Sequence, residues 1–234
     1  MLAAKNLSKR FLDLQALQDV SFEVPPRSIA GVIGPNGAGK TTLLLSVAGF
    51  LPINAGSIYW NNEPVSANSR FRSIFFYVED AVRPHASLSV SSVLQFYASV
   101  FRRPQTLLDD VIDQLALRTF LCSRVSELSK GAVKRVLIAV GLLSIQPVLL
   151  IDEPFDGLDL RQTLELTPMF RVVADKGRTL VLSIHQLRDA ERVCDHFVLL
   201  NNGRLAGTGT LPDLRQIAGA AQTSSLEDIF LALT

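Results

Sequence analysis

The 234-residue sequence has only two cysteines, Cys122 and Cys194, and no excess of either charge. Two thiols this far apart fit neither a metal-ligand motif nor a disulfide framework, so we expect both to be reduced thiols in the core of a cytosolic protein. Lys and Arg number 23 and Asp and Glu number 22, which gives a net charge of +1. A dedicated nucleic-acid-binding protein normally carries a basic stripe, so no nucleic-acid partner is expected.

Long apolar runs are also missing. The longest, Val136–Ile151, is interrupted by a serine, a glutamine and a proline and is too short to cross a bilayer. Three basic residues within the first ten positions argue against a signal peptide. The sequence shows no internal repeat and no low-complexity segment. With 48% apolar residues, it is expected to form one large domain, or a core with a smaller subdomain.

Short apolar runs closed by turn residues predict the strands of an α/β core. Alternation of apolar and polar residues up to Val24 predicts a half-buried strand, which ends where Pro25 begins a turn. The run Ser28–Gly34 predicts a fully buried strand. Further strands are expected near Ile58, near Ile74, at Val148–Asp152, at Thr179–Ile184 and at Phe197–Asn201.

Between about residue 81 and residue 145 the pattern is mainly helical. Apolar residues there recur at intervals of three and four, which places them on one face of a helix. One such face contains Val90, Val93, Leu94, Tyr97 and Phe101, and another contains Leu108, Val111, Ile112 and Leu115. An α/β core interrupted by a helical insertion is therefore the simplest interpretation.

The stretch G-P-N-G-A-G-K-T, Gly34–Thr41, fits the phosphate-loop pattern G-x-x-x-x-G-K-[ST] between a predicted strand and a predicted helix. Its glycines let backbone N–H groups turn inward around a phosphate, and the helix presents its N-terminus to the anion. Lys40 is expected to neutralise the β- and γ-phosphates, and the Thr41 hydroxyl to bind Mg²⁺. A glycine-rich turn without a ligand is the weaker alternative. The residues assigned to nucleotide binding are Gly34, Pro35, Asn36, Gly37, Ala38, Gly39, Lys40, Thr41 and Thr42.

Two carboxylates end the predicted buried strand V-L-L-I-D-E-P. Asp152 is placed to hold Mg²⁺, directly or through water. Glu153 projects one residue further, where it could accept a proton from the attacking water. Two acids capping a strand at the surface would be the ordinary interpretation, but a phosphate loop upstream makes the catalytic one stronger.

The segment Ser126–Val136, S-E-L-S-K-G-A-V-K-R-V, has two interpretations. Serine favours a helix N-cap, and Lys and Arg favour a helix interior, so it could be an ordinary helix start. Lys130 would then lie in the first turn, where the helix dipole disfavours a cation by up to ~1 kcal/mol. The alternative is a phosphate site whose ligand comes from another chain.

Together these motifs resemble those of the ATP-binding subunits of ABC transporters, and the resemblance covers nearly the whole chain. The family's order is kept: the phosphate loop, L-S-K-G-A at Leu128–Ala132, the acidic pair, G-L-D at Gly157–Asp159 and a lone His185 after a strand. The C-terminal S-S-L-E-D-I-F-L-A-L-T and the stretch F-D-G-L-D resemble the ABC-2-type exporter ATPases.

The resemblance implies that the signature segment acts in trans, facing the γ-phosphate held by the partner in a head-to-tail dimer. Where the family has L-S-G-G-Q, Lys130 replaces the first glycine and Ala132 the glutamine. Ser129 and Gly131 keep the hydroxyl and the glycine that allows close approach. An anion arriving in trans would also account for Lys130.

Three further roles follow from the resemblance. His185 matches the switch histidine that contacts the γ-phosphate and helps to hold the water, and Asp159 matches a residue that crosses the dimer interface. Phe11 falls where the family stacks an aromatic ring on adenine, with packing in the core as the alternative.

The sequence departs from the family at the glutamine that contacts Mg²⁺ and the water and senses the permease. The stretch here is F-Y-V-E-D, and its spacing to Leu88 favours Asp80 as the equivalent, although the strand end can be aligned to favour Glu79. An acid replaces an amide in either case. We interpret it as a metal-side ligand.

The resemblance implies an α/β fold with a P-loop NTPase core, an N-terminal antiparallel β subdomain and an inserted α-helical subdomain. The single ABC ATPase domain would comprise a nucleotide-binding core at 1–80 and 146–212, a helical subdomain at 81–145 that carries the signature, and a C-terminal helical tail at 213–234.

The implied function is an ATP-binding and ATP-hydrolysing subunit that requires Mg²⁺, forms a homodimer or heterodimer, and powers a separately encoded integral membrane permease, most simply for export. It would lie in the cytoplasm, peripheral on the inner face of the cell membrane. The alternatives are a soluble ABC ATPase without a transport role and a weakly catalytic regulatory subunit.

Overall fold

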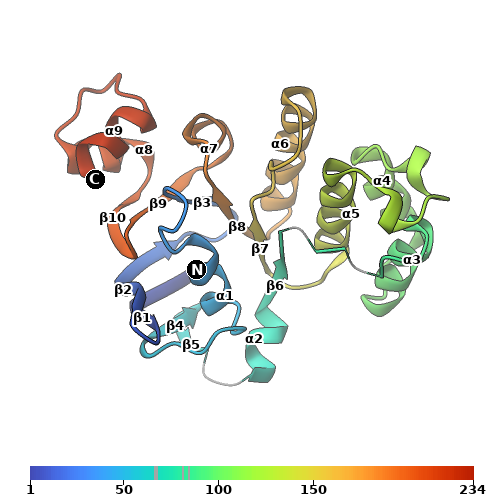
Figure 1. The fold of residues 1–234 in the computed structure, drawn as a ribbon, viewed down its shortest axis with the longest axis horizontal. Coiled ribbons are helices and arrows are strands. Elements are labelled where there is room, and N and C mark those ends of the chain that lie inside the picture. Colours follow the sequence, from blue (N-terminus) through green and yellow to red (C-terminus); the bar gives the residue numbers. More distant parts are fainter. Residues whose placement is uncertain (66–67, 81, 84) are drawn as a thin grey trace.

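The computed structural model describes residues 1–65, 68–80, 82–83 and 85–234. Over these residues the strands form two sheets (Figure 1). The smaller sheet is antiparallel, has the order β2-β1-β4-β5, and carries the N-terminus. Its strands are β1 (Leu2–Phe11), β2 (Leu14–Val24), β4 (Ala55–Trp60) and β5 (Glu63–Pro64).

The larger sheet has the order β10-β9-β3-β8-β7-β6. Neighbouring strands from β9 to β6 run parallel, and β10 joins β9 antiparallel. The strands are β3 (Ile29–Ile33), β6 (Phe75–Val78), β7 (Val148–Asp152), β8 (Thr179–Ile184), β9 (His196–Asn201) and β10 (Arg204–Gly209).

The central strands β3, β7 and β8 are buried at every position because helices cover both faces of the sheet. On one face, α1 (Lys40–Val47) packs on β7 and β8, and its apolar residues share a core with the antiparallel sheet. On the other face, α6 (Leu160–Asp175) and α7 (Leu187–Val193) pack on β3 and β8. Every residue of these three strands is thus buried, which accounts for their nearly continuous apolar runs.

The inserted helices lie to one side of the sheet (Figure 1). They are α3 (Val90–Val100), α4 (Gln105–Gln114) and α5 (Lys130–Leu143), with short 3₁₀ turns at Arg118–Phe120 and Val125–Glu127. The three helices pack on one another, and α5 also contacts β6, so it connects the insertion to the core. At the opposite end of the molecule, α8 (Leu211–Ala218) and α9 (Leu226–Leu233) form the C-terminal tail.

The α/β fold with an antiparallel N-terminal sheet and inserted helices is the one the sequence predicts. The sequence pattern did not predict β1. This strand is irregular, because Asn6 has a left-handed backbone with φ 51° and the register with β2 is broken. The pattern also did not predict α2 (Asn68–Ile74), whose last residue stands where we expected a strand. That strand is β6 and begins at Phe75.

The two cysteines differ from our expectation that both lie in the core. Cys122 is exposed, in the loop between the two 3₁₀ turns. Cys194 is buried after α7, and its burial raises the pKa of the thiol.

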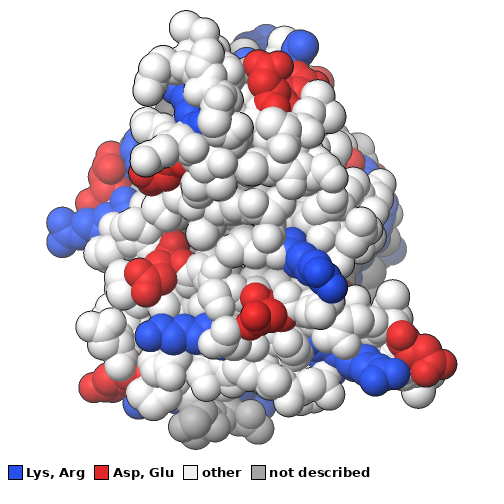
Figure 2. Space-filling model, turned by 90° about the vertical axis from the view of Figure 1, so that its left-hand side faces the viewer, with Lys and Arg blue, Asp and Glu red and all other residues white. Residues whose placement is uncertain are grey.

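Acidic and basic side chains are interspersed on the face shown in Figure 2, so charges of opposite sign alternate over that surface. Among the described residues, none of the helices is both long and apolar enough to cross a membrane.

Two arginines hold the C-terminal end of α5. Arg103, from the α3–α4 loop, donates hydrogen bonds to the carbonyl oxygens of Leu143 (2.8 Å) and Ser144 (2.7 Å). Arg178, from the α6–β8 loop, donates to the carbonyl oxygens of Gly141 and Gln146, both at 3.0 Å. Burial, with a smaller contribution from Arg103, lowers the pKa of Arg178 to about 10. Two cations therefore occupy the negative end of the helix dipole.

We expect Arg178→Met to lower the free energy of unfolding by about 2–3 kcal/mol, because it leaves helix-end carbonyls without their charged donor. In a chain of this size, the midpoint of thermal unfolding should fall by roughly 5–10 °C, which circular dichroism would measure. The control is Arg161→Met on α6, since Arg161 is 89% exposed and pairs with Glu165 in solvent. Equal midpoints for the two variants would contradict the capping role.

Candidate functional site

The phosphate loop connects β3 to α1 at the edge of the sheet where the parallel strands end. A Cβ atom on Gly34 would lie 2.2 Å from the carbonyl oxygen of Leu200. Gly39 has φ 103°, and a Cβ there would lie 2.7 Å from the carbonyl oxygen of Ala16. Close packing thus requires glycine at both positions, and the backbone conformation requires it at Gly39 as well.

A cavity of about 450 Å³ lies in front of this loop. Its lining includes Asn36, Gly37, Gly39, Lys40, Thr41 and Thr42 from the loop and helix, together with Phe11, Gln15, Glu153 and Asn202. Phe11 is 40% exposed at the edge of this cavity, which argues against a role in the core. The ammonium group of Lys9 lies 4.8 Å from the centre of the Phe11 ring. This cation–π contact fixes the ring beside the cavity.

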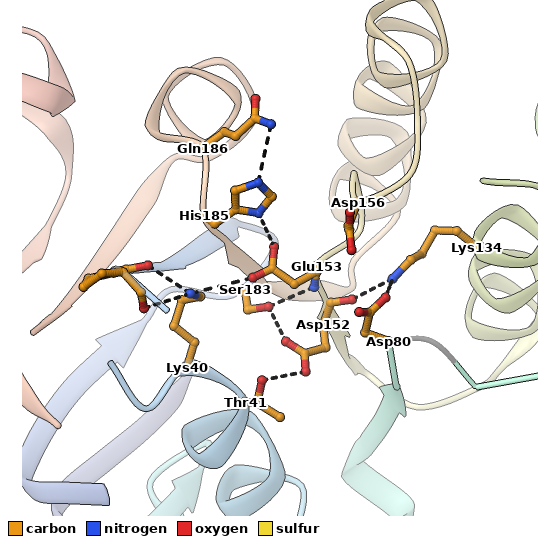
Figure 3. A network of polar contacts seen from close by, with 12 residues as sticks. Lys40, Thr41, Asp80, Lys134, Asp152, Glu153, Asp156, Ser183, His185 and Gln186 are labelled. Atoms are coloured by element: carbon orange, nitrogen blue, oxygen red, sulfur yellow. Dashed lines mark hydrogen bonds and ion pairs between the residues drawn. The ribbon is translucent and has the colours of Figure 1, made fainter. Parts of the chain in front are cut away.

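Lys40 is 7% exposed and bends back over the loop that precedes it. Its ammonium group donates to the carbonyl oxygens of Gly34 (2.9 Å) and Pro35 (3.2 Å) and lies 3.7 Å from Glu153 Oε1. The cation is therefore held by neutral carbonyls and one carboxylate, at the place where a phosphate loop receives its anion (Figure 3).

The Asp152 carboxylate accepts hydrogen bonds from three hydroxyl groups, which lie on three different elements. Thr41 Oγ1, at the start of α1, donates to Oδ2 (2.8 Å), and Tyr77 OH, on β6, donates to the same oxygen (3.1 Å). Ser183 Oγ, on β8, donates to Oδ1. Burial and then the charge of Asp152 raise the pKa of Tyr77, so its hydroxyl stays protonated as a donor. Hard oxygen atoms from Thr41 and Asp152 thus meet in one place, as a Mg²⁺ site requires.

Glu153 has a left-handed backbone, with φ 48°, which is unfavourable for a residue with a side chain. Its amide donates to Ser183 Oγ (2.9 Å), and its Oε2 lies 2.8 Å from His185 Nδ1. With Oε1 facing Lys40, the carboxylate bridges the phosphate-loop cation and the histidine (Figure 3). The structure therefore brings together the base and the switch residue that the sequence predicts.

The signature segment begins α5, and Ser129 is its N-cap, accepting a hydrogen bond from the Ala132 amide (3.3 Å). Lys130 Nζ lies 2.5 Å from Asp156 Oδ2 of the same chain. This hydrogen-bonded pair raises the pKa of Lys130 and lowers that of Asp156. A Cβ on Gly131 would lie 2.7 Å from the carbonyl oxygen of Gly157, so the helix start packs directly on this loop. Asp156 thus gives Lys130 an anionic partner in cis.

Asp159 is exposed and caps α6, accepting a hydrogen bond from the Gln162 amide (2.8 Å). The two acids at the predicted glutamine position differ in their surroundings. Glu79 is exposed, whereas Asp80 Oδ1 lies 2.5 Å from the ammonium group of Lys134.

No cluster of three or more His, Cys, Asp or Glu side chains, within the ranges that the structure describes, could hold a metal ion. A Mg²⁺ ion at Thr41 and Asp152 would therefore need further ligands, such as phosphate oxygens.

Sequence reasoning missed three residues of this site: Tyr77, Lys134 and Ser183. Ser183 and Lys134 carry a signal, since each is a polar residue flanked by apolar residues in an element that is mostly buried. Tyr77 carries none, because aromatic residues are common in strands.

The sequence profile of the ABC transporter family matches residues 17–156. The chain is 30% identical over 239 residues to the ABC-type transporter ATP-binding protein EcsA of Bacillus subtilis, covering 100% of this chain and 96% of that protein. It is 30% identical to the Nod factor export ATP-binding protein I of Rhizobium etli, covering 89% of this chain and 68% of that protein.

A solved structure described as the ATP-binding subunit of an ABC transporter superposes on the chain with a TM-score of 0.89. The two share 30% sequence identity, and the match covers 100% of this chain and 99% of the other. The phosphate loop, the acidic pair, the signature helix and the histidine lie on the fold that this family shares. The chain belongs to the ABC transporter family, as an ATP-hydrolysing, ATP-binding protein.

Proposed function

We propose that two copies of this subunit, or this subunit and a related one, close head-to-tail around two ATP molecules and drive a separately encoded integral membrane permease. The observation that carries the proposal is the bridge from Lys40 through Glu153 to His185 at the cavity in front of the phosphate loop. It joins a phosphate-binding cation to a carboxylate base and a group that can orient water.

Each residue of the cavity then has a chemical task. The loop Gly34–Gly39 surrounds the phosphates with backbone N–H groups, and Lys40 neutralises their charge. The Phe11 ring stacks on the adenine of ATP. Thr41 and Asp152 hold Mg²⁺, which supplies charge stabilisation for phosphoryl transfer. Glu153 accepts the proton of the attacking water while His185 orients it. Whether Glu79 or Asp80 adds a metal ligand stays a prediction.

The signature acts in trans in this proposal. Over the part of the chain that the structure describes, neither Ser129 nor Gly131 lines the cavity in front of its own phosphate loop. Ser129 is nevertheless exposed at the N-terminus of a 14-residue helix, which can receive an anion from a partner. Asp159, exposed at the start of α6, would cross the same interface.

The permease is expected to dock beside the segment that joins the core to the inserted helices. Val82 is 38% exposed and Leu88 is 43% exposed, as an apolar contact requires. We also assign Pro84 to this docking segment, but it lies outside the described residues. Export is favoured because the name of the Rhizobium etli relative is that of an export protein. The location on the inner face of the membrane and the subdomain boundaries at 80/81, 145/146 and 212/213 also stay predictions.

The test of the proposal is recovery of a membrane protein with the tagged chain from detergent-solubilised membranes of its own cells, followed by ATP hydrolysis in the recovered complex. Recovery of an active chain without any integral membrane protein would favour the soluble ABC ATPase instead.

Glu153→Gln should reduce ATP turnover by about 100-fold or more while ATP affinity stays within ~2-fold, because the amide keeps the shape but cannot accept the proton. Turnover would be followed by phosphate release, and affinity by a fluorescent nucleotide. The variant should accumulate as an ATP-bound dimer in light scattering. Turnover near that of the wild type would show that Glu153 is not the base.

Ser129→Arg, made in the Glu153→Gln background, should abolish the ATP-induced dimer, since the larger side chain would occupy the partner's γ-phosphate site. ATP binding to the monomer should persist, because it depends on the loop and Phe11. Ser126→Arg places the same side chain three residues earlier and should leave the dimer intact. Normal dimerisation of the Ser129→Arg variant would mean that the segment is an ordinary helix start.

Val82→Glu and Leu88→Glu should each reduce the membrane protein recovered with the tagged chain by about 10-fold, since a charge would have to be buried in an apolar contact. Ile217→Glu on α8 is the matched control, because Ile217 is 54% exposed at the other end of the molecule. Equal recovery with all three variants would exclude this docking segment.

A further inference from the structure

Lys134 is a buried lysine in the second turn of α5, and its side chain is 2% exposed. Its ammonium group reaches two acceptors on different elements of the core. Asp80 Oδ1 accepts at 2.5 Å, and the main-chain carbonyl oxygen of Asp152 accepts at 3.1 Å. Figure 3 shows Lys134 and Asp80 on one side of Asp152, away from the hydroxyl groups of Thr41 and Ser183 that bind its carboxylate.

The peptide group between Asp152 and Glu153 is consequently held at both of its polar ends. Its carbonyl oxygen accepts from Lys134, and its N–H donates to Ser183 Oγ (2.9 Å). Rotation of this peptide plane would change ψ of Asp152 and φ of Glu153 together. Because Glu153 has the unfavourable φ of 48°, its backbone would relax unless the neighbouring contacts fixed the plane.

The side chain of Glu153 depends on that backbone. In the left-handed conformation its carboxylate lies between Lys40 Nζ and His185 Nδ1, with Oε atoms at 3.7 Å and 2.8 Å. A return to a more common φ would swing the carboxylate away from both groups. A displacement of about 1 Å can reduce turnover by roughly 100-fold, because proton transfer requires close approach.

We propose that Lys134 is a positioning residue for ATP hydrolysis: with Ser183 it fixes the Asp152–Glu153 peptide and so aims the Glu153 carboxylate. Asp80 has the complementary task of balancing the charge of the buried ammonium group. The acid at the position where the family resemblance implies glutamine is then explained by its partner on α5. This inference rests on the proposed role of Glu153 as the base.

The charge balance between Lys134 and Asp80 can be tested separately from the hydrogen bond of Lys134 to the Asp152 carbonyl oxygen. Lys134→Met removes both contacts and leaves Asp80 without its cation, so it should lower the midpoint of thermal unfolding measured without nucleotide or metal. Asp80→Asn/Lys134→Met removes both charges and should regain most of that midpoint, while the peptide stays unsupported. Both variants should lose about 10–100-fold in kcat, with the KM for ATP within ~2-fold of the wild type. Arg118→Met, which breaks the exposed pair with Asp113 in the inserted helices, is the control and should change neither quantity.

The deciding experiment repeats the substitutions in the Glu153→Gln background, using single-turnover hydrolysis of labelled ATP. A residue that acts through Glu153 has nothing to position there, so Lys134→Met should cause less than ~2-fold further loss. If Lys134→Met gives no folded protein, Asp80→Asn/Lys134→Met is compared with Asp80→Asn in each background, so that any effect of Asp80 itself cancels. Equal losses in both backgrounds, or wild-type kcat for the double variant, would overturn the positioning role. Wild-type turnover by Glu153→Gln alone would overturn the proposed base, and the positioning role with it.

Discussion

The hydrogen bond from the Thr41 hydroxyl to the Asp152 carboxylate joins segments 111 residues apart, and the rest of the site is arranged around it. It forms because β3 and β7 are parallel strands of one sheet, separated by β8, so the segments that follow them emerge at the same edge. Tyr77 and Ser183 bring hydroxyl groups from the two strands that flank β7 to the same carboxylate. Lys40 directly precedes Thr41 and Glu153 directly follows Asp152, so this bond also sets the positions of the Lys40 ammonium group and the Glu153 carboxylate.

The unfavourable backbone of Glu153 stands directly beside this well-supported carboxylate. A left-handed residue with a side chain costs of order 1–3 kcal/mol. Exposed turn residues such as Leu12, with φ 47°, also adopt this conformation, but Glu153 differs from them in its surroundings. Here the preceding strand is buried at every position, and both polar groups of the intervening peptide have partners. The surrounding contacts therefore hold Glu153 in this conformation directly after a fully buried strand. Gly157, four residues later, also has a positive φ, 80°, but glycine adopts it without that cost.

The sequence permits prediction of those parts of the site whose chemistry is local. A phosphate loop and an acidic strand end each require particular residues within a few positions. Lys40, Thr41, Asp152 and Glu153 can therefore be predicted from the sequence. The contacts of Lys134 with Asp80 and of Arg178 with Gly141 are not, since each joins residues 37 or more positions apart. Such partners depend on how α5 lies against the sheet, which periodicity does not determine. The same limit explains Lys130, whose place in the first turn makes sense only once Asp156 is known to lie beside it.

Cations tie α5 to the rest of the chain near its start, in its second turn and at its end. Lys130 binds Asp156 near the start, Lys134 binds the Asp152 carbonyl from the second turn, and Arg178 binds helix-end carbonyls beyond the sheet. Hydrogen bonds from the buried Lys134 and the largely buried Arg178 are directional and costly to break, whereas the exposed Lys130 pair contributes less. A force applied to the inserted helices must therefore move the Asp152–Glu153 peptide with α5, or break the Lys134 contact. This contact connects the inserted helices to Glu153 through the main chain, so under the proposed function it offers a polar route from a docked permease to the proposed base.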